Sequence, residues 1–184
     1  MTNRAKFMSS CCVCAFMLCG VSAVSSAQEV EAGQTEILGF VGGVTDGGGT
    51  TVGGGVQYAF NPRLLLALEV GYLTLGDDFS GFGVDADSSG LSVDANVHYL
   101  FPAAASGKLT PYLLGGLGVL RASVSVSSPG FGGGDASDST LGVNVGGGAR
   151  WQAGENWGIR PELKVFIEES SNVRFSVAFY RAFN

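Results

Sequence analysis

The sequence predicts an all-β fold, an eight-stranded antiparallel up-and-down transmembrane β-barrel. The clearest observation is the stretch 90–101, in which every second residue is apolar and the residues between them are nearly all polar. Successive side chains on a β-strand point to opposite faces, so this stretch has one apolar face and one polar face. Seven further segments show similar alternation, and the connections between them alternate in length.

Four strands are predicted in the first half of the chain, each from its period of two. Their ranges are 36–44, 51–60, 64–74 and 90–101. A glycine turn follows the first strand, and Asn61-Pro62-Arg63 forms a tight turn after the second. The third strand is followed by a long predicted loop at 75–89.

Four more strands complete the predicted fold. Their ranges are 109–122, 141–151, 157–166 and 172–184. The loop predicted at 123–140 is rich in glycine and serine, although its first residues keep the strand period. Short turns on one side and long loops on the other are typical of outer-membrane barrels, whose tilted strands of about ten residues span the apolar layer.

The charged side chains of these strands fall on the polar faces. They are Glu69, Asp94, His98, Arg150, Arg160, Glu162, Lys164 and Arg174. The interior of an eight-stranded barrel is only wide enough for side chains, and an unpaired buried charge is costly. We therefore expect these residues to form a structural charge network in a filled interior without a large pore.

The apolar faces carry aromatic residues close to the short turns. They are Tyr58, Phe60, Tyr99, Phe101, Trp151, Trp157 and Phe183. Aromatic side chains gather where a membrane protein meets the lipid–water interface. The sequence thus favours lipid outside the barrel and the charged residues inside.

Residues 1–27 have the features of a cleaved signal peptide. Arg4 and Lys6 form a basic start, an apolar segment follows from about residue 7 to 24, and Ser25-Ser26-Ala27 offers small residues for cleavage. The expected organisation is this signal, a short lead-in at 28–35 and the barrel domain at 36–184.

The four cysteines, at positions 11, 12, 14 and 19, all lie within the predicted signal. The mature chain therefore has no disulfide, zinc thiolate or thiol nucleophile. Losing Arg4 and Lys6 leaves 8 basic and 16 acidic residues, a net charge of −8, which argues against nucleic acid as a partner.

The chain resembles the small eight-stranded outer-membrane barrels of the OmpA, OmpX and Ail type. The resemblance rests on the signal peptide, the glycine-rich alternating strands, Pro111-Tyr112-Leu113-Leu114-Gly115-Gly116 and Arg160-Pro161-Glu162-Leu163. It implies surrounding lipid and lipopolysaccharide, and recognition of the last strand by the barrel-assembly machinery. Family members usually end on an aromatic residue, whereas here Asn184 follows Phe183, and Arg181 occupies a usually apolar position.

Two groups of residues suggest other chemistry. Asp94 and His98 share a face and could form a hydrolase pair, but we interpret both as structural lumen residues. Asp77, Asp78, Asp85 and Asp87 could bind calcium, yet their spacing does not match an EF-hand, and a solvated acidic loop is the preferred interpretation. No cofactor, metal site or catalytic residue is predicted.

The four predicted outer loops contain no lysine or arginine. Two of them carry Phe79, Phe82 and Phe131, which mark either a contact surface for a host or surface ligand or side chains that fold back onto the barrel rim.

These observations together predict a non-enzymatic outer-membrane barrel of a Gram-negative bacterium with a structural or adhesin-like role. Three alternatives stay open: a narrow porin-like channel, a hydrolase at the rim, and a soluble secreted β-barrel that binds an apolar ligand inside.

Overall fold

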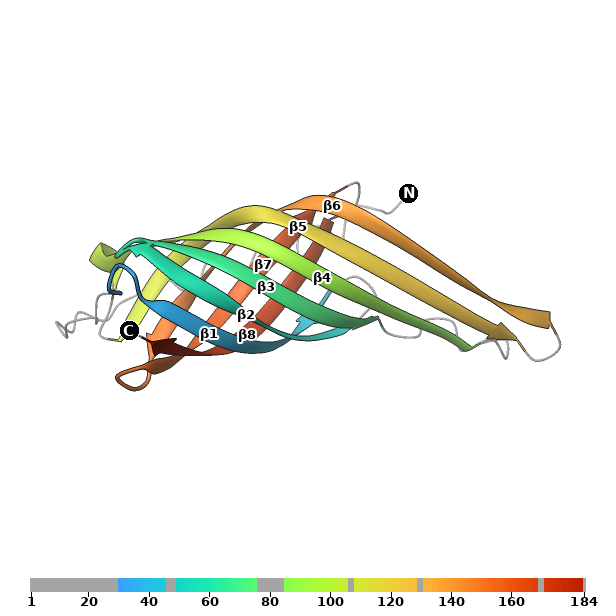
Figure 1. The fold of residues 1–184 in the computed structure, drawn as a ribbon, viewed down its shortest axis with the longest axis horizontal. Helices are drawn as coiled ribbons and strands as arrows, with labels where there is room; N and C mark the ends of the chain where they lie inside the picture. The colour runs from blue at the N-terminus through green and yellow to red at the C-terminus, as the bar shows by residue number, and fades with distance from the viewer. Residues whose placement is uncertain are drawn as a thin grey trace, which may run out of the picture.

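The computed structural model describes residues 30–45, 49–75, 85–105, 108–128, 131–168 and 171–183. They form eight antiparallel strands in sequence order, and β1 pairs with β8, so the sheet closes into a barrel (Figure 1). The strands are β1 Thr35–Val44, β2 Thr50–Asn61, β3 Leu64–Leu75, β4 Asp85–Leu100, β5 Leu109–Ser128, β6 Phe131–Gln152, β7 Trp157–Ile167 and β8 Ser171–Phe183. The predicted fold class is confirmed.

We call the end of the barrel that holds Thr35 and Phe183 the terminal end, and the opposite end the distal end. The connections β2–β3, β4–β5 and β6–β7 lie at the terminal end, and the second of them contains the 3-10 helix η2, Pro102–Ala104. No helix in the described part of the chain is long and apolar enough to cross a membrane.

Two loop predictions are wrong in their extent. Strand β4 begins at Asp85, inside the loop predicted at 75–89. The loop predicted at 123–140 is instead a hairpin, because β5 continues to Ser128 and β6 begins at Phe131. Glycine, serine and aspartate favour turns in isolation, but a sheet neighbour offers every backbone group a partner, and pairing overrides that preference.

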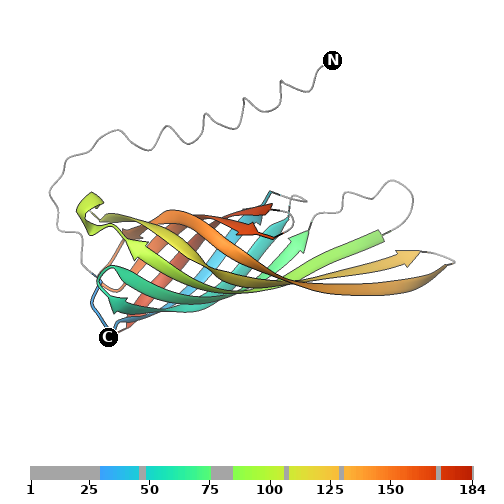
Figure 2. The ribbon, with the colours of Figure 1, turned by 90° about the horizontal axis from the view of Figure 1, so that it is seen from above.

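Strands β4, β5 and β6 run beyond the rest of the barrel at the distal end, as Figures 1 and 2 show. The pairing of β6 with β7 stops at Val143, so residues 131–142 of β6 pair with β5 alone. We call this projecting sheet the extension; it comprises residues 85–88 of β4, 120–128 of β5 and 131–142 of β6.

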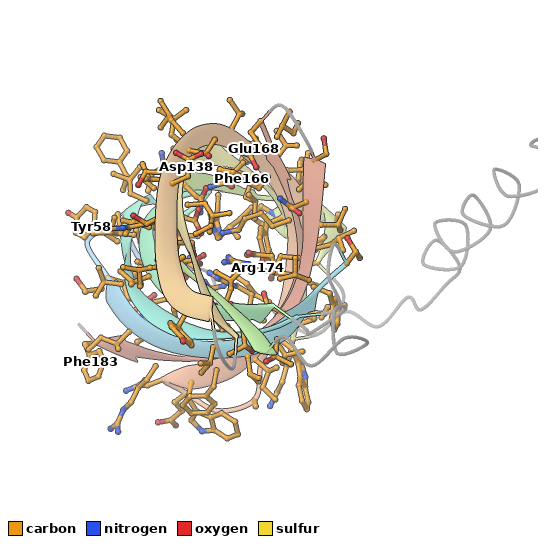
Figure 3. All side chains as sticks on the ribbon, turned by 90° about the vertical axis from the view of Figure 1, so that its right-hand side faces the viewer. Tyr58, Asp138, Phe166, Glu168, Arg174 and Phe183 are labelled. Carbon is orange, nitrogen blue, oxygen red and sulfur yellow. The ribbon has the colours of Figure 1, made fainter. Side chains whose placement is uncertain are left out.

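The faces of the strands follow the alternation in the sequence. Between Leu91 and Tyr99 of β4, the apolar side chains point outwards and the polar side chains point into the lumen. Viewed from the distal end, Tyr58 and Phe183 project from the outer surface, whereas Arg174 lies inside the barrel (Figure 3). This is the reverse of a soluble barrel, which would place its apolar face inside.

The terminal end of the lumen is closed by apolar side chains. They are Ala59, Leu65, Leu100, Tyr112 and Leu114, and Val30 packs against them from the lead-in segment. The lead-in is held there by backbone hydrogen bonds between Gly33 or Gln34 and Ala59. Gly33 turns the chain at this point with φ +91°, a conformation that glycine adopts at little cost.

Inward-facing glycines make room for the large side chains of the lumen. A Cβ at Gly53 would meet the carbonyl of Val70 and the ring of Phe40, and one at Gly148 would meet the ring of Tyr112. At Gly39, which faces outwards, the nearest atom to an added Cβ is 3.8 Å away. Glycine is thus required sterically at Gly53 and Gly148 on the inner face, but not at Gly39 on the outer one.

We expect Gly53→Ala to destabilise the barrel by about 1–3 kcal/mol, because overpacking forces backbone or ring shifts. The matched variant Gly39→Ala should change stability by no more than about 0.5 kcal/mol. Urea unfolding of both refolded variants measures the difference, and equal losses would contradict the assignment of inner and outer faces.

Candidate functional site

The centre of the lumen is organised around Glu69 of β3. Its carboxylate accepts hydrogen bonds from Arg160 Nη2 at 2.5 Å and Lys164 Nζ at 2.8 Å, both from β7. Arg174 Nη2 of β8 adds a third contact at 3.2 Å. Strands β3 and β7 stand opposite each other in the ring of eight, so these bonds brace the barrel across its interior.

Asp94 of β4 forms a second centre, closer to the distal end. Its Oδ2 lies 3.4 Å from both Lys164 Nζ and Arg174 Nη1, and its Oδ1 accepts from Asn144 Nδ2 at 3.0 Å. The same Asn144 amide reaches Asn96 Oδ1 at 3.1 Å. Lys164 and Arg174 each bridge Glu69 and Asp94, so the two centres form one network.

A separate pair lies nearer the terminal end. Arg150 of β6 donates two hydrogen bonds to Glu36 of β1, at 2.6 and 2.9 Å, and its guanidinium lies over the ring of Tyr180 at 4.3 Å. Such a two-bond arginine–carboxylate contact combines strength with a fixed geometry. Glu36 was not identified from the sequence, since the glycines of β1 obscure its alternation.

His98 and Glu162 meet through Tyr112. The Tyr112 hydroxyl donates to Glu162 Oε2 at 2.7 Å, and the His98 ring stacks on Tyr112 with centroids 5.0 Å apart. Gln57 Nε2 lies 3.5 Å from His98 Nδ1. Tyr112 was assigned no role from the sequence, because β5 carries apolar residues on both faces.

The structure places all eight residues of the predicted charge network in the lumen. They are Glu69, Asp94, His98, Arg150, Arg160, Glu162, Lys164 and Arg174, and each is buried. With Glu36 added, the buried charges among the described residues are four acids and four bases. The lumen is therefore neutral when His98 is neutral, which minimises the cost of burying charge.

The remaining predicted residues lie elsewhere. Phe131 is the first residue of β6, at the tip of the extension. Asp85 and Asp87 are the first and third residues of β4. Phe79, Phe82, Asp77 and Asp78 lie outside the described residues.

The geometry does not join Asp94 and His98 into a catalytic pair. Four residues along an extended strand span about 13 Å, which is far beyond hydrogen-bonding distance. Asp94 is engaged by Asn144, Lys164 and Arg174, whereas His98 contacts Tyr112 and Gln57. Each side chain has a structural environment of its own.

One buried group could in principle hold a metal ion. Ligand atoms of Glu69, His98 and Glu162 lie within 4.8 Å of one another. Both carboxylates, however, already form ion pairs with Arg160 and Lys164. A divalent cation would have to sit beside these two fixed positive charges, so the donor set fits a metal poorly.

A family model identifies the group of proteins to which this sequence belongs. The sequence model described as "Outer membrane protein beta-barrel domain" matches residues 11–177. The chain belongs to this family. The resemblance inferred from the sequence is thereby confirmed at the level of the barrel family.

Solved structures of outer-membrane barrels share the fold. The N-terminal β-barrel domain of Pseudomonas aeruginosa OprF is 18% identical with a TM-score of 0.62, covering 84% of this chain and 100% of that one. Neisserial surface protein A is 18% identical with a TM-score of 0.64, and the match covers 84% of this chain and 100% of that one. Ail of Yersinia pestis is 19% identical with a TM-score of 0.57, and the match covers 83% of this chain and 99% of that one. No curated protein matches the chain in sequence.

Replacing Glu69 by glutamine should cost about 3–5 kcal/mol of barrel stability, because Arg160, Lys164 and Arg174 would lose their shared counter-ion in a buried site. Glu155→Gln, at an exposed position in the β6–β7 turn, should change stability by at most about 0.5 kcal/mol. Denaturant unfolding in detergent or lipid measures both. A Glu69→Gln barrel as stable as the control would show that the network contributes nothing.

Proposed function

We propose that the chain is a non-enzymatic surface-interaction barrel of the bacterial outer membrane, and that the extension is its contact surface. Residues 1–27 are removed on export, 28–35 form the lead-in and 36–184 form the membrane domain. The terminal end faces the periplasm and the distal end faces outwards, as expected for an outer-membrane barrel that has both its termini on the periplasmic side.

The outer surface of the barrel supports this location. Large apolar side chains such as Ile37, Leu68 and Val93 are about half exposed, as a lipid-facing surface requires. Of the nine exposed aromatics among the described residues, six lie near the terminal end, where they would mark the inner interface of the membrane. They are Tyr58, Phe60, Tyr99, Trp151, Trp157 and Phe183.

Two partners follow from this location. Lipid and lipopolysaccharide surround the apolar surface, and the barrel-assembly machinery receives the chain through β8. Arg181 of β8 points outwards with its guanidinium 5.6 Å from the centre of the Phe183 ring, so a cation lies beside the aromatic residue that the machinery would read.

The observation that carries the interaction role is the open edge of β6. Residues 131–142 pair with β5 on one side, whereas the ladder with β7 begins only at Val143. At about 3.4 Å per residue, this leaves roughly 40 Å of strand that no other described strand pairs with on its second side. Such an edge is a template for an added strand from another protein.

The negative charge of the extension favours a positively charged partner. Its described residues include Asp85, Asp87, Asp135 and Asp138, against the single basic residue Arg121. Asp138 pairs with Ala122 of β5 within the projecting sheet. An extended segment rich in lysine or arginine would find both backbone partners and opposite charge there.

A comparison with Ail sharpens this choice. That protein has been solved in complex with sucrose octasulfate, an analogue of heparin and a polyanion. The acidic extension of the present chain would repel a sulfated ligand. We therefore infer a basic protein segment, rather than a sulfated polysaccharide, as the partner class.

A channel role has weaker support. Apolar side chains close the terminal end, and the Glu69 network fills the centre. A continuous water path would require both to rearrange. Each buried carboxylate of the lumen is ion-paired with an arginine or lysine, which likewise supports a non-enzymatic role.

The location is tested by fractionation. The expressed protein should be recovered with outer membranes and should run faster on an unboiled gel than after heating, because a closed barrel resists detergent until it unfolds. Recovery in the soluble periplasmic fraction, without a heat-dependent shift, would contradict the membrane assignment.

The contact surface is tested with a peptide of alternating lysine and threonine and a matched peptide of glutamate and threonine. We expect the basic peptide alone to bind the folded barrel, with affinity that falls as salt rises. A barrel in which residues 124–136 are replaced by Asn-Gly should lose this binding, since Ser123 and Ser137 face each other across the hairpin and a two-residue turn can join them.

The matched control is Glu155→Gln, which removes an acid at the opposite end of the barrel. It should bind the basic peptide like the unmodified chain. Equal binding of both peptides, or full binding by the shortened barrel, would rule out the extension as the contact surface.

A further inference from the structure

The distal end of the lumen contains a cavity of about 230 Å³ that the charge network does not fill. Its wall is apolar and comprises Val44, Leu73, Leu120 and Phe166. Its polar side is formed mainly by Asp94, Asn144, Lys164 and Arg174. Roughly 150 Å³ suffices to hold a benzene molecule, so this cavity has room for an aromatic ring and several further atoms.

Two residues that line the cavity each carry a buried side-chain atom that has no hydrogen-bond partner within the described part of the chain. Asn144 is 0% exposed and donates through Nδ2 to Asp94 and Asn96, but its Oδ1 accepts from no group. Arg174 is 8% exposed, and its Nε donates to no group. A buried polar atom without a partner is costly, so the cavity lacks one donor and one acceptor.

Arg174 is held less tightly than the other two bases around Glu69, and its guanidinium also lies over the Phe40 ring at 4.9 Å from the ring centre. Both of its ion-pair contacts are long, 3.2 Å to Glu69 and 3.4 Å to Asp94, whereas Arg160 and Lys164 hold Glu69 at 2.5 and 2.8 Å. Figure 3 shows Arg174 inside the barrel as seen from the distal end. A carboxylate entering from that end could take the unpaired Nε together with an adjacent amino group.

The charge balance restricts the ligand further. The lumen already holds four acids and four bases, so a ligand with net charge would leave an unbalanced charge in a region shielded from water. A ligand that carries both signs, and is neutral overall, avoids this cost. Its ammonium group could donate to Asn144 Oδ1 and lie close to Asp94.

We propose that this cavity is a binding site for a small zwitterion with an apolar body, of the chemical class of an α-amino acid with an apolar side chain. The carboxylate binds Arg174, the ammonium group binds Asn144 and Asp94, and the side chain packs against Phe166 and Leu73. The site lies within the lumen and does not involve the edge of β6, so it can stand or fall independently of the proposed contact surface.

The test compares three probes of similar size on the folded barrel in lipid nanodiscs. L-Phenylalanine carries both charges, 3-phenylpropionate only the negative one and 2-phenylethylamine only the positive one. Calorimetric titration should show L-phenylalanine binding at least about tenfold more tightly than either analogue, because each analogue leaves one buried group unpaired. Equal or tighter binding of a singly charged analogue would overturn the proposal.

Two variants locate the site. Arg174→Gln should weaken L-phenylalanine binding at least about tenfold. Because Arg174 also contacts Glu69 and Asp94, Ser92→Leu provides a second variant that changes no charge. Ser92 lines the cavity, and its hydroxyl makes only a 3.5 Å contact with the Gly71 carbonyl, so a leucine there fills the space.

The matched control is Gln57→Leu, a lumen substitution beside His98 and away from the cavity, which should bind L-phenylalanine normally. Heat-dependent gel mobility establishes that each variant is folded. Undiminished binding by folded Ser92→Leu barrels, or no saturable binding of L-phenylalanine by the unmodified barrel, would also overturn the proposal.

Discussion

The structure depends on one constraint: the centre of an eight-stranded barrel is only about wide enough for side chains, so every charge buried there must be matched by another. Glu69 meets this constraint most fully, since it binds Arg160, Lys164 and Arg174 from the far wall. The Glu36–Arg150 pair balances two more buried charges nearer the terminal end. Both interactions join strands that are not neighbours in the sheet. They therefore fix the cross-section of the barrel, whereas backbone hydrogen bonds between neighbouring strands would allow the barrel to flatten.

The glycines of the inner face follow from the same constraint. Large inward side chains fit only where the neighbouring strand carries no side chain beside them. Gly118 leaves room for Asp94 and Asn144, Gly142 for Phe166. The high glycine content, 30 of 184 residues, is therefore linked to the charge network rather than to flexible loops alone.

The period of two in the sequence predicted the eight strands, because burial on one side and lipid on the other impose it residue by residue. The barrel and the orientation of its faces were predicted from the alternating connection lengths and the aromatic residues near the short turns. The prediction from this pattern failed in the glycine- and serine-rich segment 123–140, where a loop was expected. There, β5 and β6 pair through their backbones, and the side chains give no alternating pattern throughout the segment. The pattern also missed Glu36 and Tyr112. Neither has a distinctive local pattern, and each acquires its role from a partner more than 45 residues away, Arg150 and Glu162.

The neutrality of the lumen has a consequence for the rest of the molecule. If four acids and four bases cancel inside, the net charge of −8 expected for the mature chain must be carried by the two ends of the barrel. The terminal end offers Arg63, Lys108 and Arg181 to balance its acids, whereas the described distal residues offer only Arg121. The same end also has the open edge of β6 and the unfilled cavity. Stability requirements dominate the centre and the terminal end, and the distal end is where residues are free to serve recognition.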